Sequence, residues 1–323
     1  MKKVDIKLGY SCNNDCIHCV VADNRDICSA RGKSENLTTE EYKRELLDSR
    51  SRGYEVIVFT GGEPTLRNDL GHLMLYAHNL GYEIDVQTNG RRFCSREFTD
   101  ALCSISRASY CIALHGFNEA IHDTITAVRG SFSETVAGIE NLLRLGQFVV
   151  GKIVISKVNA PFILETCRLN SRLGIRNLTL TFPHALGNAR KYFSRVVPTY
   201  SETVPELHKA IDFCRSEGIS VNTEAFPFCL MRGYEEHVLE LFFTDEQTEL
   251  KQHGRDYALD WSKARLDNKA KFAGCAECCY DLICEGPWSE YPGWFGEGEF
   301  RPVRNERKYK KQELIELTRN RKQ

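Results

Sequence analysis

Hydrophobic residues in the first 183 positions form two alternating kinds of segment. Between apolar runs, apolar residues recur at helical spacing, as in 38–53 and 131–146. Gly53 and Gly146 occupy positions typical of helix C-caps, and Thr38 with Glu41 fits a capping box. Six runs predict buried β-strands: VDIKLGY (4–10), EVIVFT (55–60), EIDVQT (83–88), YCIALH (110–115), FVVGKIVIS (148–156) and NLTLTF (177–182).

This alternation predicts an α/β fold with a parallel sheet, because parallel neighbours need crossover helices. Six strands predict an open sheet or a partial barrel, with its chemistry at the carboxyl ends of the strands. A helix at 200–217 and a strand at 219–226 follow, and beyond residue 225 the pieces are short and rich in Gly, Cys and aromatic residues. We therefore expect a barrel domain of residues 1–195 and a small Cys-rich α+β extension of residues 196–323, stapled by metal.

Composition and charge narrow the classes of function. The 323 residues are 42% hydrophobic and 27% charged, as in ordinary globular proteins. No apolar run approaches the roughly 18 residues of a membrane span, and the N-terminus lacks a signal-peptide pattern. We expect a cytoplasmic protein without a membrane partner. A net charge of −1 gives no general attraction to nucleic acid, which makes a nucleic-acid substrate an unfavoured alternative.

The C-terminal tail departs from this neutral balance. Residues 301–323 hold nine Lys and Arg against three Glu. Two interpretations are compatible with this segment: a solvated amphipathic helix or frayed end, and a basic surface that steers an acidic partner.

Fourteen cysteines are many for a reducing compartment, where clustered thiols bind metal or act in catalysis. Cys12, Cys16 and Cys19 share one loop with the spacing C-x3-C-x2-C. Thiolates are the preferred ligands of iron–sulfur clusters, and three of them leave one iron of a [4Fe–4S] cluster open. Structural zinc prefers four closed ligands, so zinc is the weaker alternative here. His18 adjoins Cys19 and is therefore a poor ligand for the same ion.

The loop CNNDCIHC (12–19) after the first strand, and GGEP (61–64) after the second, resemble the signatures of the radical S-adenosylmethionine (radical SAM) superfamily. This resemblance implies a partial (β/α)6 barrel of the TIM type, a [4Fe–4S] cluster on Cys12, Cys16 and Cys19, and S-adenosylmethionine at the open iron. Electron transfer would then give a 5′-deoxyadenosyl radical that abstracts a substrate hydrogen atom. Lys152, Asn159 and the segment 183–190 resemble further lining positions. The expected cofactor-binding residues are Gly61, Gly62, Glu63, Pro64, Thr88, Asn89, His115 and Ser156.

A second group of thiols lies in the C-terminal part. Cys275, Cys278 and Cys284 resemble the Twitch (half-SPASM) extensions that hold one auxiliary [4Fe–4S] cluster. Cys229 is the expected fourth ligand, with Cys279 as the alternative, and structural zinc on these residues stays open. Cys229 and Cys279 are also candidate catalytic hydrogen donors. Cys111 is a third candidate, although its place in the fourth strand favours the core.

Three classes of function fit these residues. The leading hypothesis is a maturase that modifies a peptide or protein side chain. The alternative is an epimerase or dehydrogenase of a sugar, aminoglycoside or other small metabolite, which suits the absence of a leader-recognition domain before the first strand. A non-catalytic iron–sulfur electron-transfer protein is the remote alternative, since it would need neither GGEP nor an open iron. Either enzyme would need an electron donor such as flavodoxin or ferredoxin.

Overall fold

The computed structural model describes residues 2–32, 34–243, 248–251 and 259–320, and its centre is one sheet of nine strands. The strand order is β7-β6-β5-β4-β3-β2-β1-β8-β9, and every pair is parallel except β8 with β9. The six predicted strands are confirmed, with ends shifted by a few residues. They are β1 (Lys3–Lys7), β2 (Val56–Thr60), β3 (Glu83–Thr88), β4 (Ser109–Ala113), β5 (Phe148–Val154) and β6 (Asn177–Thr181).

The sheet is wider than the six-stranded sheet predicted from the sequence. The strand expected at 219–226 is β7 (Ser220–Glu224), and it pairs with β6. On the other edge β8 (Thr248–Lys251) pairs with β1, and β9 (Leu259–Asp260) follows. The division of the chain at residue 195 stays a prediction, but β7 lies beyond that point and belongs to the same sheet.

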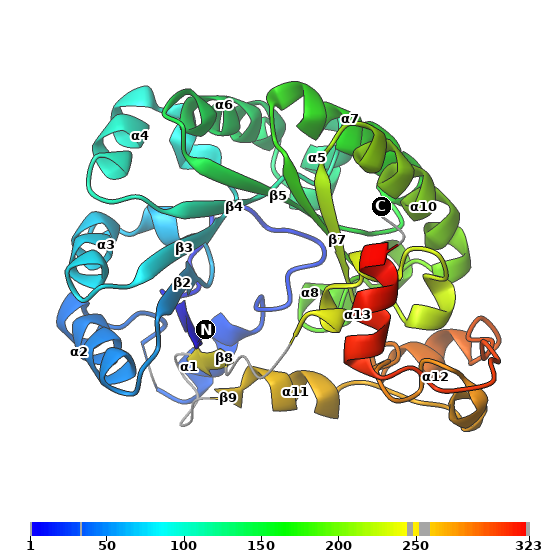
Figure 1. Cartoon of the computed structure of the whole chain (residues 1–323). Helices are drawn as coiled ribbons and strands as arrows, with labels where there is room; N and C mark the ends of the chain where they lie inside the picture. Colours follow the sequence, from blue (N-terminus) through cyan, green and yellow to red (C-terminus); the bar gives the residue numbers. More distant parts are fainter. Residues whose placement is uncertain (1, 33, 244–247, 252–258, 321–323) are drawn as a thin grey trace.

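Helices line the outside of the arc of strands (Figure 1). Residues Thr38 and Glu41 form the predicted capping box of α2, and Gly53 and Gly146 take left-handed conformations with φ of 84° and 65° just past their helices. The α-helices that precede β7 are α1 (Asn24–Ala30), α2 (Thr39–Ser51), α3 (Leu70–Asn79), α4 (Arg96–Cys103), α5 (Glu119–Thr126), α6 (Ser131–Arg144), α7 (Ile163–Leu173), α8 (Asn188–Lys191), α9 (Phe193–Val196) and α10 (Tyr200–Ser216).

The apolar core lies between the sheet and these helices. Ile57 and Phe59 of β2 and Leu73 and Met74 of α3 are fully buried there. Side chains alternate along a strand, so the neighbouring positions face the inside of the arc. On that inner side the strands carry mostly polar residues, and this leaves room for a ligand.

Beyond β7 the chain forms short elements, as the composition predicted. Beyond β7 lie the 3-10 helices η4 (Phe228–Leu230), η5 (Glu235–His237), η6 (Leu239–Leu241) and η7 (Ala273–Glu277), and before it lie η1 (Pro64–Leu66), η2 (Arg91–Cys94) and η3 (Ala160–Phe162). The late α-helices are α11 (Trp261–Asp267), α12 (Tyr291–Phe295) and α13 (Lys311–Asn320).

The basic tail forms an amphipathic helix, which was one of its two interpretations. In α13, Leu314, Ile315 and Thr318 are buried, while most of the other described side chains face solvent. Among the described residues, no helix combines the length and apolar character that crossing a membrane requires.

Candidate functional site

The loop after β1 opens into a cavity of about 730 Å³ at the carboxyl ends of the strands. Cys12, Cys16 and Cys19 all line this cavity as free thiols. The loop after β2, the ends of β3 to β6 and the segment 181–188 complete its wall. The volume lies in the range of small-molecule and cofactor sites.

Backbone contacts hold the thiol loop from two sides. The N–H groups of Asp15 and Ile17 donate to carbonyls at the end of α5, each at 2.9 Å. On the other side, Asn188 donates from its backbone N–H to Cys19 O and from Nδ2 to Cys16 O, both at 2.9 Å. The backbone around Cys16 and Cys19 is therefore held by contacts within the protein itself.

The electrostatics of this loop suit metal ligation. Burial raises the pKa of Cys12 to about 11, and burial with the neighbouring thiols raises the pKa of Cys16 further above its usual range. Burial also raises the pKa of Cys19. Thiolates here need positive charge close by, and iron ions supply it. The donor set, three soft sulfurs on one wall, fits a [4Fe–4S] cluster.

Gly61 and Gly62 line the cavity, and the structure shows why glycine is needed there. A Cβ on Gly61 would lie 2.3 Å from Gly9 O, and one on Gly62 would lie 2.2 Å from Ser11 O. Gly61 also has a φ of 129°. Gly62 N donates to Gly9 O at 2.9 Å. The glycines let the loop after β2 pack against the start of the thiol loop.

Glu63 ties the loop after β2 to the end of β3. Its Oε1 accepts hydrogen bonds from the N–H and Oγ1 of Thr65 at 3.1 and 2.6 Å, and from Thr88 Oγ1 at 2.7 Å. Its Oε2 accepts from Asn89 N at 2.7 Å. Asn89 in turn points Nδ2 at Cys12 Sγ, 3.9 Å away. Burial raises the pKa of Glu63, and these donors oppose that rise.

His115 lies two residues beyond β4, at the cavity wall, and its tautomer is fixed. The Val154 N–H donates to His115 Nδ1 at 3.2 Å, so the ring proton is on Nε2. The His18 ring meets it edge-on at 4.6 Å, and His122 stacks at 5.9 Å. Burial lowers the pKa of all three, to about 4 for His18 and His122. His115 thus presents a neutral N–H donor.

Three of the individually predicted residues, Pro64, Ser156 and Asn159, do not line the cavity. Pro64 is buried at the first position of η1, and Ser156 is fully buried, with its N–H donating to Asn159 Oδ1 at 2.6 Å. They shape the loops after β2 and β5 and do not form the wall, so a direct contact with a cofactor stays a prediction. Cys111 corrects the expectation of a core residue, because it lines the cavity.

Arg91 and Trp288 bear on the site but were missed by sequence reasoning, and of the two only Trp288 lines the cavity. Arg91 donates to Asn13 O and, at 2.9 Å, to Asn14 Oδ1 of the thiol loop, and it pairs with Glu134 at 2.6 Å. Its position three residues beyond β3 is an available signal. His184, in the segment 183–190, was named only as part of that segment. Trp288 comes from the C-terminal part, and no local pattern announces it.

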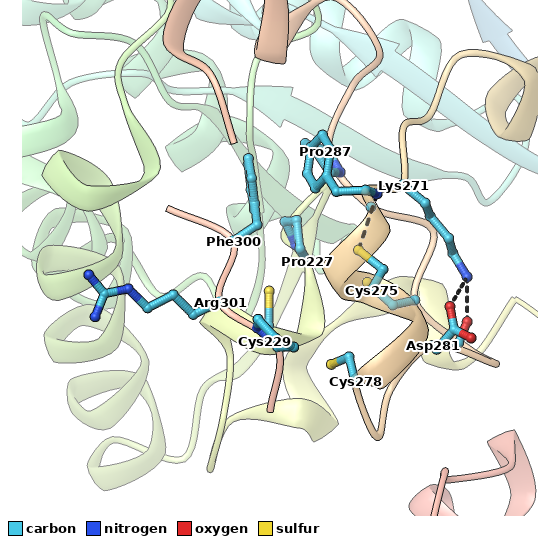
Figure 2. A pocket seen from close by; sticks show the side chains of 13 residues that line it. Pro227, Cys229, Lys271, Cys275, Cys278, Asp281, Pro287, Phe300 and Arg301 are labelled. Atoms are coloured by element: carbon cyan, nitrogen blue, oxygen red, sulfur yellow. Dashed lines mark hydrogen bonds and ion pairs between the residues drawn. The ribbon is translucent and has the colours of Figure 1, made fainter. Parts of the chain in front are cut away.

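A second hollow is lined by four thiols of the C-terminal part. Figure 2 shows Cys229, Cys275 and Cys278 gathered around it, with Pro227 and Phe300 beside them, and Cys284 lines it too. Phe272 N donates to Cys275 Sγ, and Val303 N donates to Cys278 Sγ, both at 3.4 Å. Such N–H···S bonds are typical of sulfurs that carry negative charge in a cluster.

Cys279 does not belong to this hollow. It lines a different pocket with Arg232, Glu235 and Tyr280. Adjacent side chains point in different directions, so Cys278 and Cys279 cannot share one hollow. Cys229, and not its alternative Cys279, is therefore the fourth thiol that lines this hollow.

The spread of the thiols bears on which metal they fit. In the part of the chain that the structure describes, no group of three or more His, Cys, Asp or Glu is arranged to hold a metal ion. Four sulfurs around one zinc lie only about 3.8 Å apart at a Zn–S distance of about 2.3 Å. A cubane spreads its ligands over separate irons. Whether the four-thiol hollow holds a cluster or zinc stays a prediction.

The two thiol sites share one segment of chain. Cys284 and Pro287 line the hollow, and Trp288 lines the main cavity. Trp288 stacks on His184 with ring centroids 3.9 Å apart. Four residues span at most about 14 Å, so the two sites are close neighbours.

Comparison with known proteins identifies the family of this chain and supports its fold. The family model of the radical SAM superfamily matches residues 6–169, which is half of the chain. The chain belongs to the radical SAM superfamily. The cofactors of this superfamily are a [4Fe–4S] cluster and S-adenosylmethionine, and they are therefore the cofactors of this chain. The partial-barrel fold predicted from the sequence is confirmed.

Relatives within the superfamily differ in what their names describe. The chain is 35% identical over 149 residues to Fe-coproporphyrin III synthase of Methanosarcina barkeri, which covers 46% of this chain and 35% of that protein. It is 32% identical over 175 residues to mycofactocin maturase MftC of Mycolicibacterium smegmatis, covering 52% and 41%. The chain thus spans well under two thirds of either relative.

A solved structure agrees with the fold. SuiB of Streptococcus suis bound to S-adenosylmethionine superimposes with a TM-score of 0.65 at 13% identity, over 88% of this chain and 72% of that chain. At this identity the likeness concerns the fold alone.

Proposed function

We propose that this chain is a radical SAM enzyme that modifies a side chain of a peptide or protein with net oxidation. Cys12, Cys16 and Cys19 would hold the [4Fe–4S] cluster, which together with S-adenosylmethionine supplies a 5′-deoxyadenosyl radical for removal of a substrate hydrogen atom. The chain's own residues orient and enclose the reactants. Glu63 fixes the loop after β2, and His115 offers a neutral N–H donor to the cavity.

The observation that carries the proposal is the hollow of four thiols beside the cavity. Cys229, Cys275, Cys278 and Cys284 would hold an auxiliary [4Fe–4S] cluster. Net oxidation of a substrate radical releases one electron, and a second centre whose wall shares the segment 284–288 with the cavity could accept it. Zinc in the hollow could not take this role, because it has no redox chemistry.

Two observations support a peptide as substrate. MftC is named a maturase, and SuiB, which shares the fold, has been solved bound to its precursor peptide SuiA. Exposed apolar side chains also lie at or near the cavity: the lining residue Val20 is 47% exposed, and Leu186, two residues beyond the lining residue His184, is 43% exposed. An extended chain could lie across such a rim with one side chain in the cavity.

A second candidate is an epimerase of a small metabolite or peptide residue, and Cys111 favours it. Neither Cys229 nor Cys279 lines the main cavity. Cys111 does line it, from within β4, four residues before His115. A thiol there could return a hydrogen atom to the substrate radical, and a one-electron carrier would then reduce the thiyl radical with uptake of a proton. Flavodoxin or ferredoxin in the cytoplasm is the proposed source of electrons for either reaction.

The product distinguishes the two candidates. The anaerobically reconstituted protein would be incubated in D₂O with S-adenosylmethionine, a reductant and peptides encoded beside its gene. Oxidation predicts 5′-deoxyadenosine and a peptide that has lost two hydrogens. Epimerisation predicts a peptide that has gained one deuterium in place of hydrogen. Release of 5′-deoxyadenosine without any change in these peptides would contradict a peptide substrate, and a Cys12→Ala variant is the blank.

A further inference from the structure

The inner side of the sheet carries a row of polar side chains at one level. Lys7 is in register with Thr60, and Gln87 is in register with Cys111. Thr60 Oγ1 donates to Gln87 Oε1 at 3.5 Å, which joins the two pairs. All four line the cavity. Bulky apolar residues fill the interior of a closed α/β barrel, so this polar row marks a surface that binds something.

Lys152 of β5 faces the same space. Its Nζ donates to Glu224 Oε2 at 3.0 Å, and Thr181 Oγ1 donates to the same oxygen at 2.7 Å. Lys152 lines the cavity, with 28% of its side chain exposed, whereas Glu224 is not among the lining residues. Burial alone would lower the pKa of Lys152, but the attraction of Glu224 raises it. The ammonium group of Lys152 is therefore charged and is held by Glu224.

Lys7 repeats this arrangement on β1. Its Nζ lies 3.0 Å from Asp5 Oδ1, and again the lysine lines the cavity while the carboxylate does not. Lys7 and Lys152 line the same cavity from two strands, β1 and β5. Two lysines thus line one volume, and each is paired with a carboxylate that is not among the lining residues.

We propose that Lys7 and Lys152 bind a carboxylate of the substrate, carried by an acidic side chain or by the chain end of a peptide. An ammonium group has three donors, and in the described structure Glu224 takes one of those of Lys152. Charge-assisted hydrogen bonds to an anion would use the others. The two carboxylates offset the charge of the two lysines. A doubly charged phosphate would therefore add more uncompensated negative charge here than a carboxylate, so a monoanion fits better.

This inference rests on the proposed radical chemistry in the same cavity and adds the substrate class. The hydrogen atom to be removed would lie above the carboxylate, toward the cysteine loop.

Binding of small probes tests the inference without knowledge of the substrate. Isothermal calorimetry on the reconstituted protein with S-adenosylmethionine would compare four capped residues. N-acetyl-glutamate N-methylamide carries a side-chain carboxylate, and N-acetyl-glutamine carries one at its chain end. N-acetyl-glutamine N-methylamide is the neutral match, and the N-acetyl-phosphoserine N-methylamide is the dianion. We expect one of the two carboxylates to bind at least about tenfold more tightly than the neutral probe.

Variants assign that preference to the lysine. Lys152→Gln should reduce the preference about tenfold or more, and the double variant Lys152→Gln with Glu224→Gln should do the same while avoiding an unpaired buried carboxylate. Lys209→Gln is the matched control, because Lys209 is 61% exposed on α10 and pairs only locally with Glu206. An unchanged preference in both Lys152 variants would overturn the inference.

The remaining outcomes are equally decisive. Equal or undetectable binding of all probes would overturn the inference, and tighter binding of the phosphoserine probe would overturn the carboxylate. Release of 5′-deoxyadenosine by the wild-type preparation is measured in parallel. If it occurs while the probes show no preference, only this inference fails. If it does not occur, the proposed function itself fails.

Discussion

The indole of Trp288 lies flat against the imidazole of His184, with ring centroids 3.9 Å apart and planes inclined by 4°. Lys269 Nζ lies 3.8 Å from the centroid of the same indole. Because His184 lines the main cavity and Trp288 follows Cys284 by four residues, this stack joins the walls of the two thiol sites. It fixes the C-terminal segment against the barrel.

The stack should control the pKa of His184. Burial, and then the charge of Lys269, lower that pKa to about 4. Trp288→Ala admits water to the ring, so we expect the pKa to rise toward its ordinary value of 6.5. Trp288→Phe keeps an aromatic cover and should give a smaller rise. Titration of the His184 ring by NMR measures this, and a pKa of about 4 in the Ala variant would refute the explanation.

Glu63→Gln should destabilise both the protein and the cofactor site. The carboxylate accepts four hydrogen bonds, and an amide would turn its N–H groups toward some of these donors. We expect a loss of about 2–4 kcal/mol in the free energy of unfolding, together with weaker binding of S-adenosylmethionine. Urea denaturation and calorimetry measure these effects. Glu83→Gln, at the exposed start of β3, is the control, and equal behaviour of both variants would contradict the role of Glu63.

His122 should make stability depend on pH between about 7 and 5. Burial lowers its pKa from 6.5 to about 4, so the unfolded chain binds a proton in this interval that the folded protein does not. The stability that His122 contributes is thus present above pH 6.5 and is lost as the pH falls toward 4.

The backbone N–H of His115 donates to His122 Nδ1 at 3.1 Å, and His122→Asn keeps an acceptor for it. Between pH 7 and pH 5 we expect the wild type to lose about 2 kcal/mol more than this variant. Chemical denaturation across the interval provides the measurement, with exposed His72 replaced by Asn as the control. Parallel pH curves for wild type and His122→Asn would show that the buried ring is not responsible.

Cys229→Ala and Cys279→Ala form a matched pair. Cys229 lines the four-thiol hollow, whereas its counterpart Cys279 lines another pocket. We expect Cys229→Ala to lower the iron content by up to about four atoms per chain, and Cys279→Ala to leave it unchanged. Iron analysis after anaerobic reconstitution decides between them. The reverse result would make Cys279 the ligand.

Much of the fold followed from local patterns. Apolar runs separated by amphipathic segments predicted six strands within a few residues, and the Thr38 and Glu41 pair predicted a helix start that the structure confirms. β8 was missed because it is four residues long and polar. Its place beside β1 also depends on pairing between distant parts of the chain, since Lys3 pairs with Thr248.

The site divides in the same way. Cys12, Cys16 and Cys19 share a loop, and their spacing alone brought them together. Partners from different strands could not be paired from the sequence: Lys152 was named, but Glu224 was not, because only the three-dimensional register brings β5 and β7 to one space. Ser156 and Pro64 show the opposite limit, since a position at a strand end does not reveal which way its side chain turns.

The central claim is that three cysteines hold a cluster at which S-adenosylmethionine is cleaved, while four others hold a second cluster. The most direct test counts iron in the anaerobically reconstituted protein and measures 5′-deoxyadenosine after reduction with S-adenosylmethionine. The account predicts about eight irons per chain and release of 5′-deoxyadenosine, and in the Cys12, Cys16 and Cys19 triple Ala variant about four irons and none of that product. A wild-type protein that holds zinc in the Cys12 loop, or carries its full iron and never releases 5′-deoxyadenosine, would contradict it.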